Sequence, residues 1–129
     1  MNYESEIGEL LSNPDKNSME LAIRRLNGKG NSYGSLTKAN GDYLQVGGGI
    51  KEFTVEFRKI HKNGFKHFKA TKTEENLESH IIKIGGSKVT VREDQVLDLQ
   101  MTCQIFFAFI EGEPDVEGIK WVDMTSMFE

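Results

Sequence analysis

Residues 98–121, DLQMTCQIFFAFIEGEPDVEGIKW, contain the segment that decides the fold. The run from Ile105 to Ile110 is the longest unbroken apolar stretch in the chain. It is too short to cross a bilayer, because a membrane-spanning helix takes roughly 20 apolar residues. The run therefore belongs to a buried helix or a buried strand.

Signals at both ends of this run favour a helix over about residues 98–111. Asp98 is a good N-cap, because its carboxylate can accept hydrogen bonds from the free N–H groups of the first turn. Gly112 is expected to take the left-handed conformation just past the helix, and Pro114 then prevents continuation. Two overlapping apolar stripes at helical spacing run through Leu99, Cys103, Phe106 and Ile110 and through Thr102, Ile105, Phe106 and Phe109. A helix that is apolar nearly all round is expected to have neighbours on more than one side.

The chain before residue 30 predicts helices. Ile7, Leu10 and Leu11 have helical spacing within Tyr3–Leu11, which indicates a short first helix. Asn17 with Glu20 three residues later resembles a capping box, and it predicts a helix over 18–27 that ends at Gly28.

From Tyr33 onward the apolar period changes from about 3.6 residues to two, which is typical of strands. Asn40-Gly41, Asn63-Gly64 and Gly85-Gly86 mark three hairpins, and the first is expected to be a type I′ turn with positive φ at both residues. The six strands expected around these turns cover 35–39, 42–46, 53–58, 65–71, 80–84 and 88–92. We therefore expect an α+β fold: an antiparallel meander of about six strands, with an N-terminal helix and a long buried C-terminal helix packed on one face.

Two further segments complete the expected fold. Gly47-Gly48-Gly49 lacks the Gly-Lys-Ser/Thr ending of a phosphate loop and precedes a strand, so it is interpreted as a flexible or bulged hairpin corner. After the main helix, Ile119–Val122 predicts a last short strand, followed by a tail, 124–129, that packs or frays.

Length and composition indicate one domain over residues 1–129. The one cysteine, Cys103, cannot form an internal disulfide and is expected to behave as a small hydrophobic residue. The acidic N-terminus does not resemble a secretory signal, and we expect no membrane-spanning segment. The expected location is therefore the cytoplasm.

The net charge is −4, which argues against general nucleic-acid binding. The charges are unevenly distributed along the chain. Residues 58–72 form a basic band with no acid: Arg58, Lys59, Lys62, Lys66, Lys69 and Lys72. From residue 111 onward the one basic residue is Lys120, whereas six residues are acidic: Glu111, Glu113, Asp115, Glu117, Asp123 and Glu129. Each run is either a solvated surface or a charged face that steers a partner of opposite sign.

The sequence offers no convincing catalytic, cofactor-binding or metal-binding residue, and we expect the protein not to be an enzyme. His61, His67 and His80 have no metal-like spacing, and the first two are interpreted as surface residues. The acids near the C-terminus alternate along an expected loop with nothing to position them as general acids or bases.

Trp121 is the only tryptophan. Either it closes over the main helix as a core or edge residue, or it anchors an interface, since tryptophan is enriched at binding hot spots.

The order of these features resembles a family of known proteins. The matching pieces are the strand–glycine–strand unit 44–57, the strand-to-helix passage 89–112, and Trp121 after the helix. Together with the early helix, they look like an immunity protein of bacterial polymorphic toxin systems, in the α+β family named first among these immunity proteins. The resemblance covers about residues 19–123, and the polar interval 73–79 departs from the family pattern.

The resemblance implies a non-enzymatic function. Such proteins bind and neutralise a cognate toxin domain, often a nucleic-acid deaminase or nuclease, by covering its active site or substrate cleft. An inhibitor of this kind needs a negative surface that can cover a basic cleft. Glu111, Glu113, Asp115 and Glu117 are the candidate partner-binding residues, with Trp121 as a candidate anchor.

Other interpretations stay open at this stage. The basic band could instead meet an acidic toxin face, and the chain could be a small protein-interaction or scaffold domain of unrelated role. Direct nucleic-acid binding ranks low, because Phe65 and Phe68 are the only aromatics interleaved with the basic band. No membrane partner is expected, and the protein is expected to be a monomer or a weak homodimer, since edge strands can pair between copies.

Overall fold

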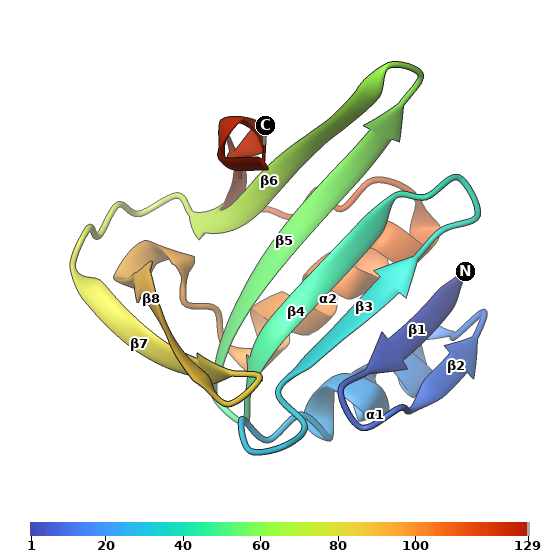
Figure 1. Ribbon diagram of the computed structural model, residues 1–129, viewed down its shortest axis with the longest axis horizontal. Helices are drawn as coiled ribbons and strands as arrows, with labels where there is room; N and C mark the ends of the chain where they lie inside the picture. The colour runs from blue at the N-terminus through green and yellow to red at the C-terminus, as the bar shows by residue number, and fades with distance from the viewer. Residues whose placement is uncertain (129) are drawn as a thin grey trace.

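An antiparallel sheet of seven strands carries both α-helices on one of its faces (Figure 1). The computed structural model describes residues 1–128. The strand order is β2-β1-β3-β4-β5-β6-β9. The strands of this sheet are β1 (Asn2–Ser5), β2 (Leu10–Ser12), β3 (Tyr33–Thr37), β4 (Tyr43–Gly49), β5 (Glu52–His61), β6 (Gly64–Lys72) and β9 (Ile119–Asp123). The α+β class expected from the sequence is confirmed.

The two helices are α1 (Lys16–Arg24) and α2 (Leu99–Glu111). Asp98 caps α2 as expected, since its side chain accepts a hydrogen bond from the backbone N–H of Met101 at 2.8 Å. Gly112 is extended, with φ at 163°, so the expectation of a left-handed residue after α2 is wrong. The cap of α1 also differs from the expected one: Asp15, not Asn17, accepts from Ser18, and the helix begins two residues earlier than predicted.

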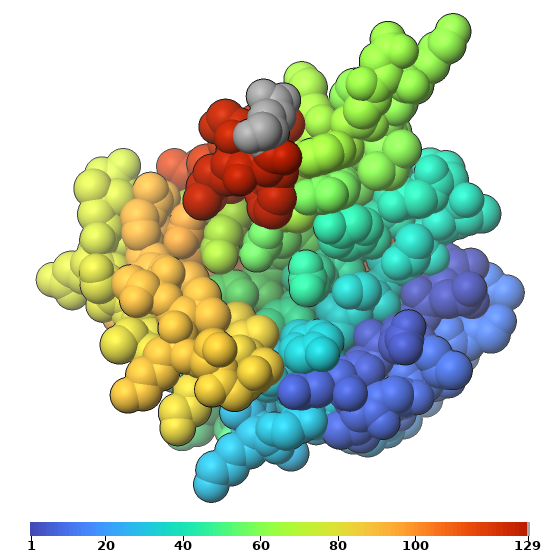
Figure 2. Space-filling view, viewed as in Figure 1, coloured from blue at the N-terminus to red at the C-terminus, as the bar shows by residue number. Residues whose placement is uncertain are grey.

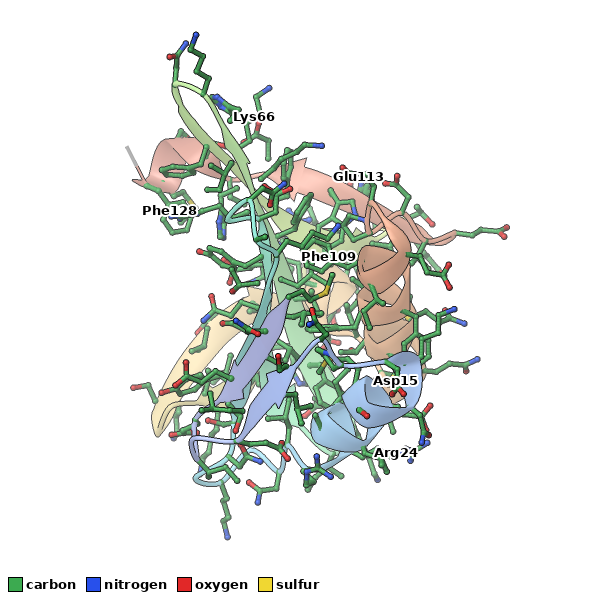
Figure 3. All side chains as sticks on the ribbon, turned by 90° about the vertical axis from the view of Figure 1, so that its right-hand side faces the viewer. Asp15, Arg24, Lys66, Phe109, Glu113 and Phe128 are labelled. Atoms are coloured by element: carbon green, nitrogen blue, oxygen red, sulfur yellow. The ribbon has the colours of Figure 1, made fainter. Side chains whose placement is uncertain are left out.

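The hydrophobic core lies between the helices and the inner face of the sheet. Alternate residues of the central strands, such as Leu44, Val46, Phe53 and Val55, are completely buried there. They pack in one cluster with the buried residues of α1 and α2. Figure 3 shows the helices on one side of the sheet, with Phe109 of α2 turned toward it. Residues at the intervening positions form the opposite, outer face of the sheet.

The first segment of the chain is a β-hairpin, so the short helix expected over Tyr3–Leu11 is wrong. β1 pairs with both β2 and β3, and Tyr3 is completely buried. Gly8, with φ at 82°, allows the turn between β1 and β2. Ile7 and Leu10, which suggested a helical face, are exposed. Pairing with β3 thus outweighs a weak local helical pattern.

The strands β7 (Ser79–Ile84) and β8 (Ser87–Arg92) form a separate two-stranded sheet. The meander of six strands is therefore wrong in this detail: of the six strands expected, β3 to β6 form a meander in the main sheet, and β7 and β8 do not join it. The physical reason is that β9 occupies the free edge of β6, with Ala70 opposite Trp121. The β7–β8 hairpin, called the arm below, lies over the outer face instead (Figures 1 and 2).

The three expected hairpins are present, and the Gly85-Gly86 turn lies at the predicted residues. Gly85 and Gly86 both have positive φ, 60° and 81°, in a two-residue turn. The turn between β5 and β6 is Lys62-Asn63, one residue earlier than the predicted Asn63-Gly64. Asn40 does not have positive φ, and Lys38 N–H donates to the Asp42 carbonyl across a longer loop, so the type I′ prediction for Asn40-Gly41 is wrong.

The three glycines 47–49 lie within β4, and the corner that follows is Ile50-Lys51. Ile50 has φ at 66°, a left-handed conformation that costs a β-branched residue about 1–2 kcal/mol. Its backbone N–H donates to the Leu26 carbonyl at 3.2 Å, and Gly49 pairs with Asn27 in an isolated bridge. These contacts with the chain after α1 hold the corner in place.

The chain ends with β9 and a short 3-10 turn, η2 (Thr125–Phe128), which lies on the outer face near β6. A second 3-10 turn, η1 (Glu93–Gln95), links the arm to α2. The last strand is as predicted, and the tail packs as far as Phe128; Glu129 lies outside the described residues. No helix in the described part of the chain has the length and apolar character needed to cross a membrane.

Candidate functional site

The acidic segment, residues 111–117, connects α2 to β9. Glu111 is the last residue of α2, and Glu113, Asp115 and Glu117 follow it in the loop. All four acidic side chains are exposed. Figure 3 shows Glu113 at the end of α2. The structure therefore gathers the four predicted carboxylates at one end of the molecule.

Contacts on both sides hold this loop in one conformation. Pro114 is buried, and its carbonyl accepts a hydrogen bond from the Trp121 indole Nε1–H at 3.0 Å. The Gly112 carbonyl accepts from the Lys38 ammonium at 2.5 Å. That ammonium also lies 4.2 Å from the centroid of the Phe109 ring, a favourable cation–π distance. The carboxylates therefore project from a fixed backbone.

Two of the four carboxylates are neutralised by lysines from distant parts of the chain. Lys16 pairs with Glu111, and the Lys59 ammonium lies 2.9 Å from a carboxylate oxygen of Glu113. The hydrogen bond to Glu113 raises the pKa of Lys59. Sequence reasoning missed these partners because they lie far away in the chain and only the fold brings them to the loop.

Asp115 and Glu117 make no ion pair with any of the residues that the structure describes, 1–128. Both are exposed. The negative field expected from four acids therefore comes mainly from two of them.

Trp121 lies on β9 and packs on the core. Its ring centroid is 5.7 Å from that of Phe57, in an edge-to-face arrangement. The side chain is half-buried, and its N–H is satisfied by Pro114. The interpretation of Trp121 as a residue that closes the core is confirmed, and it also anchors the acidic segment. A direct role in partner binding stays a prediction.

The basic band does not form a single surface. Because side chains alternate across a strand, Lys59 points to the helix side, where it meets Glu113, and Arg58 points to the outer face. Lys69 lies 3.8 Å from Glu56 on that outer face. At the projecting end of the β5–β6 hairpin, Lys62 lies in the turn, and Lys66 lies opposite Lys59 in the strand register (Figure 3).

His67 is 2% exposed, so its interpretation as a surface residue is wrong, whereas His61 is exposed as expected. Arg58 Nε–H donates to His67 Nδ1 at 3.1 Å, which assigns the ring proton to Nε2. His67 Nε2 then donates to Glu56 Oε1 at 2.6 Å. The Phe128 ring covers the imidazole, with 4.3 Å between ring centroids. The polar atoms of this ring are thus occupied within the fold.

His80 lies between two carboxylates. Its Nδ1 is 2.7 Å from Glu93, and its Nε2 pairs with Glu52. The hydrogen bond to Glu93, with a contribution from Glu52, raises the pKa of His80 above its usual 6.5. The imidazole therefore ties the base of the arm to the start of β5.

Two further predictions concern metal-binding and reactive groups. Within residues 1–128 no group of three or more histidine, cysteine, aspartate or glutamate side chains is arranged to hold a metal ion. Cys103 is buried, and its burial raises the pKa of the thiol to about 11. The thiol is therefore protonated at neutral pH, as a small core residue would be.

Comparisons with protein-family models, with curated proteins and with solved structures find no match to this chain. The functional argument therefore depends on the residues and the geometry described above.

Proposed function

We propose that this chain is a non-enzymatic immunity protein that binds a cognate bacterial toxin domain and covers its active site or substrate cleft. The observation that carries the proposal is the pair of exposed carboxylates, Asp115 and Glu117, on a loop fixed by Trp121 and Lys38. A preorganised acidic loop loses little conformational entropy on binding. It also attracts a basic cleft of the kind that binds nucleic acid.

The toxin is a nucleic-acid deaminase or nuclease in this proposal, and the inhibitor meets it in the bacterial cytoplasm. The inhibitor needs no cofactor, no metal and no membrane, and acts as a monomer or a weak homodimer. Its contribution is steric and electrostatic, because charged groups around an interface mainly accelerate association and exclude wrong partners.

A co-expression rescue tests the proposal. The C-terminal domain encoded by the adjacent upstream gene is expressed from a tightly controlled promoter, with and without this chain. We expect the domain to stop growth and this chain to restore it through a complex that can be isolated. A domain that is harmless, or that kills regardless, contradicts the proposal and favours the scaffold interpretation.

Charge variants then test the acidic segment. We expect Asp115→Asn with Glu117→Gln to lower the association rate constant by roughly tenfold at low salt, because two steering charges are lost. Glu74→Gln with Glu75→Gln, at two exposed positions between β6 and β7, removes the same charge and serves as the control. Equal association rates for the two double variants would assign binding to another surface.

A further inference from the structure

Asparagine is followed by glycine at three places in this chain: Asn27-Gly28, Asn40-Gly41 and Asn63-Gly64. Glycine has no Cβ, so its backbone nitrogen is poorly shielded from the asparagine side chain that precedes it. That nitrogen can attack the side-chain amide and close a five-membered succinimide ring, which makes asparagine a chemically labile residue. Ring closure requires rotation of both the side chain and the backbone of the asparagine. The fold therefore decides which of the three sites can react.

The fold restrains Asn27-Gly28. Asn27 Oδ1 accepts a hydrogen bond from the Lys29 backbone N–H at 2.8 Å, which fixes the side chain in an Asx turn. The Asn27 backbone pairs with Gly49 in an isolated bridge, and a Cβ on Gly49 would overlap the Gly28 nitrogen. Rotation of Asn27 would break these contacts.

A similar set of contacts restrains Asn40-Gly41. Asn40 Oδ1 accepts from the Asp42 backbone N–H at 2.9 Å, and Gly41 N–H donates to the Lys38 carbonyl at 3.0 Å. The Asp42 side chain in turn accepts from the Ile60 N–H at 2.8 Å. The loop is therefore tied to β5 as well as to itself.

Asn63-Gly64 has no comparable restraint on its side chain. Asn63 lies in the two-residue turn of the β5–β6 hairpin, and both Asn63 and Gly64 are exposed. The Asn63 side chain makes no hydrogen bond with any of residues 1–128. Its backbone is tied by the pairing of His61 with Gly64, which is the last pair of the hairpin.

The end of this hairpin projects beyond the neighbouring strands (Figure 1). The pairing of β4 with β5 reaches only Arg58, and the pairing of β9 with β6 reaches only Phe68. From Lys59 to Lys66 the two strands therefore pair with each other alone. A two-stranded ribbon is marginally stable in water, and the ends of such elements open with little free energy. Local opening gives Asn63 the rotational freedom that Asn27 and Asn40 lack.

We propose that Asn63 is a site of spontaneous deamidation. The Gly64 backbone nitrogen bonds to Cγ of Asn63 and releases its proton to solvent. The bond from Cγ to Nδ2 breaks, and Nδ2 leaves as ammonia. Water then opens the succinimide to aspartate or isoaspartate. A carboxylate thus replaces a neutral amide beside Lys62 at the tip of the hairpin. This chemistry needs no partner and is independent of the proposed function.

Incubation of the purified protein at mildly alkaline pH tests the site. One sample is kept in buffer and the other in guanidinium chloride at a concentration that unfolds the chain. Peptide mapping by mass spectrometry follows each asparagine through the gain of about 1 Da that accompanies conversion of an amide to an acid.

The three sites act as controls for one another. In guanidinium chloride we expect similar rates at Asn27, Asn40 and Asn63, because each then lies in a flexible chain. In buffer, Asn63 should keep its unfolded-state rate to within roughly threefold, whereas Asn27 and Asn40 should slow by roughly tenfold or more. Folded protein in which Asn63 reacts no faster than Asn40 would overturn the proposal. A preference for Asn63 that is equally large in guanidinium chloride would also overturn it, because the fold would then not be the cause.

Asn63→Gln is the matched variant. Glutamine would have to close a six-membered ring, which forms far more slowly, and the substitution lies in an exposed turn where the chain should fold unchanged. Folded wild type should develop a more acidic form on anion exchange, and folded Asn63→Gln should not. An acidic form that appears in both proteins at the same rate would overturn Asn63 as the site.

Discussion

Gly34 of β3 makes room for Tyr3 of the neighbouring strand β1. A Cβ on Gly34 would overlap the Tyr3 ring, so the close approach of these strands requires glycine. The Tyr3 hydroxyl is buried without a hydrogen-bond partner among residues 1–128, and burial raises the pKa of Tyr3 to about 12. The apolar ring, not the hydroxyl, therefore fixes the first strand to the core.

His80 predicts a pH dependence of stability at the residue scale. Its pKa is raised in the folded state by Glu93 and Glu52. The stabilisation is therefore complete below about pH 6.5, the ordinary pKa of histidine, and is lost as the pH rises through the higher folded-state value. We expect wild type to exceed His80→Gln in the free energy of unfolding by up to about 1 kcal/mol at pH 5.5.

Urea unfolding of wild type and His80→Gln between pH 5.5 and 8.5 checks this prediction. The difference between the two proteins in the free energy of unfolding should become smaller as the pH rises. His61→Gln is the control, because His61 is exposed and makes no ion pair with the described residues. The difference between wild type and His61→Gln in the free energy of unfolding should therefore not change with pH. A constant difference between wild type and His80→Gln would show that the charge of His80 does not contribute.

At the scale of elements, the arm depends on contacts with the main sheet. Ile84 of β7 fills the space above Gly47 of β4, where a Cβ would lie 2.6 Å from the Ile84 Cδ1. Gly85 N–H donates to the Ser32 hydroxyl at 2.7 Å. The arm is thus attached near its tip by these two contacts and at its base by His80.

Gly47→Val should detach the tip of the arm, because its larger side chain occupies the space of Ile84. Valine is well suited to a strand, so we expect the main sheet to remain folded. Hydrogen–deuterium exchange should become at least tenfold faster in 79–92 and stay unchanged in β5. Thr37→Val, at an exposed position of β3, is the control. An unchanged exchange rate in 79–92 of the Gly47→Val protein, compared with the wild type, would show that Ile84 does not hold the arm.

At the scale of the whole molecule, the N-terminal hairpin closes one edge of the sheet. Deleting residues 1–12 removes Tyr3 from the core and exposes the edge of β3. We expect the free energy of unfolding to fall by about 3–5 kcal/mol, as for the loss of a large aromatic core residue. We also expect concentration-dependent association through the uncovered strand, visible by light scattering.

The full-length variant Tyr3→Ala separates the two effects of this deletion. It should lose similar stability but stay monomeric, because β1 still covers the edge of β3. A deleted chain that remains as stable and as monomeric as the wild type would contradict the role assigned to the hairpin.

The two faces of the molecule differ in what they can offer a partner. The helix side carries the acidic segment, with Glu113 at the end of α2 (Figure 3). The arm and the C-terminal turn lie on the outer face, where Phe128 covers His67 (Figure 2). The proposed interface therefore belongs to the helix side.

Local chemistry determined the elements that the sequence predicted correctly. The cap at Asp98, the stop at Pro114, and the alternation of Phe53 and Phe57 with polar residues involve neighbours in the chain, so a single sequence reveals them. The acidic segment was predictable for the same reason, since its carboxylates are close together in sequence.

Only the tertiary structure decided how these elements pair and which charges remain free. The first segment became a strand because β3 offers it an edge, and the arm left the main sheet because β9 occupies the edge of β6. Lys16 and Lys59 neutralise half of the acidic segment from distant positions. Partners that are far apart in sequence leave no periodic signal, so strand order, ion pairing and the strained corner at Ile50 follow from packing alone.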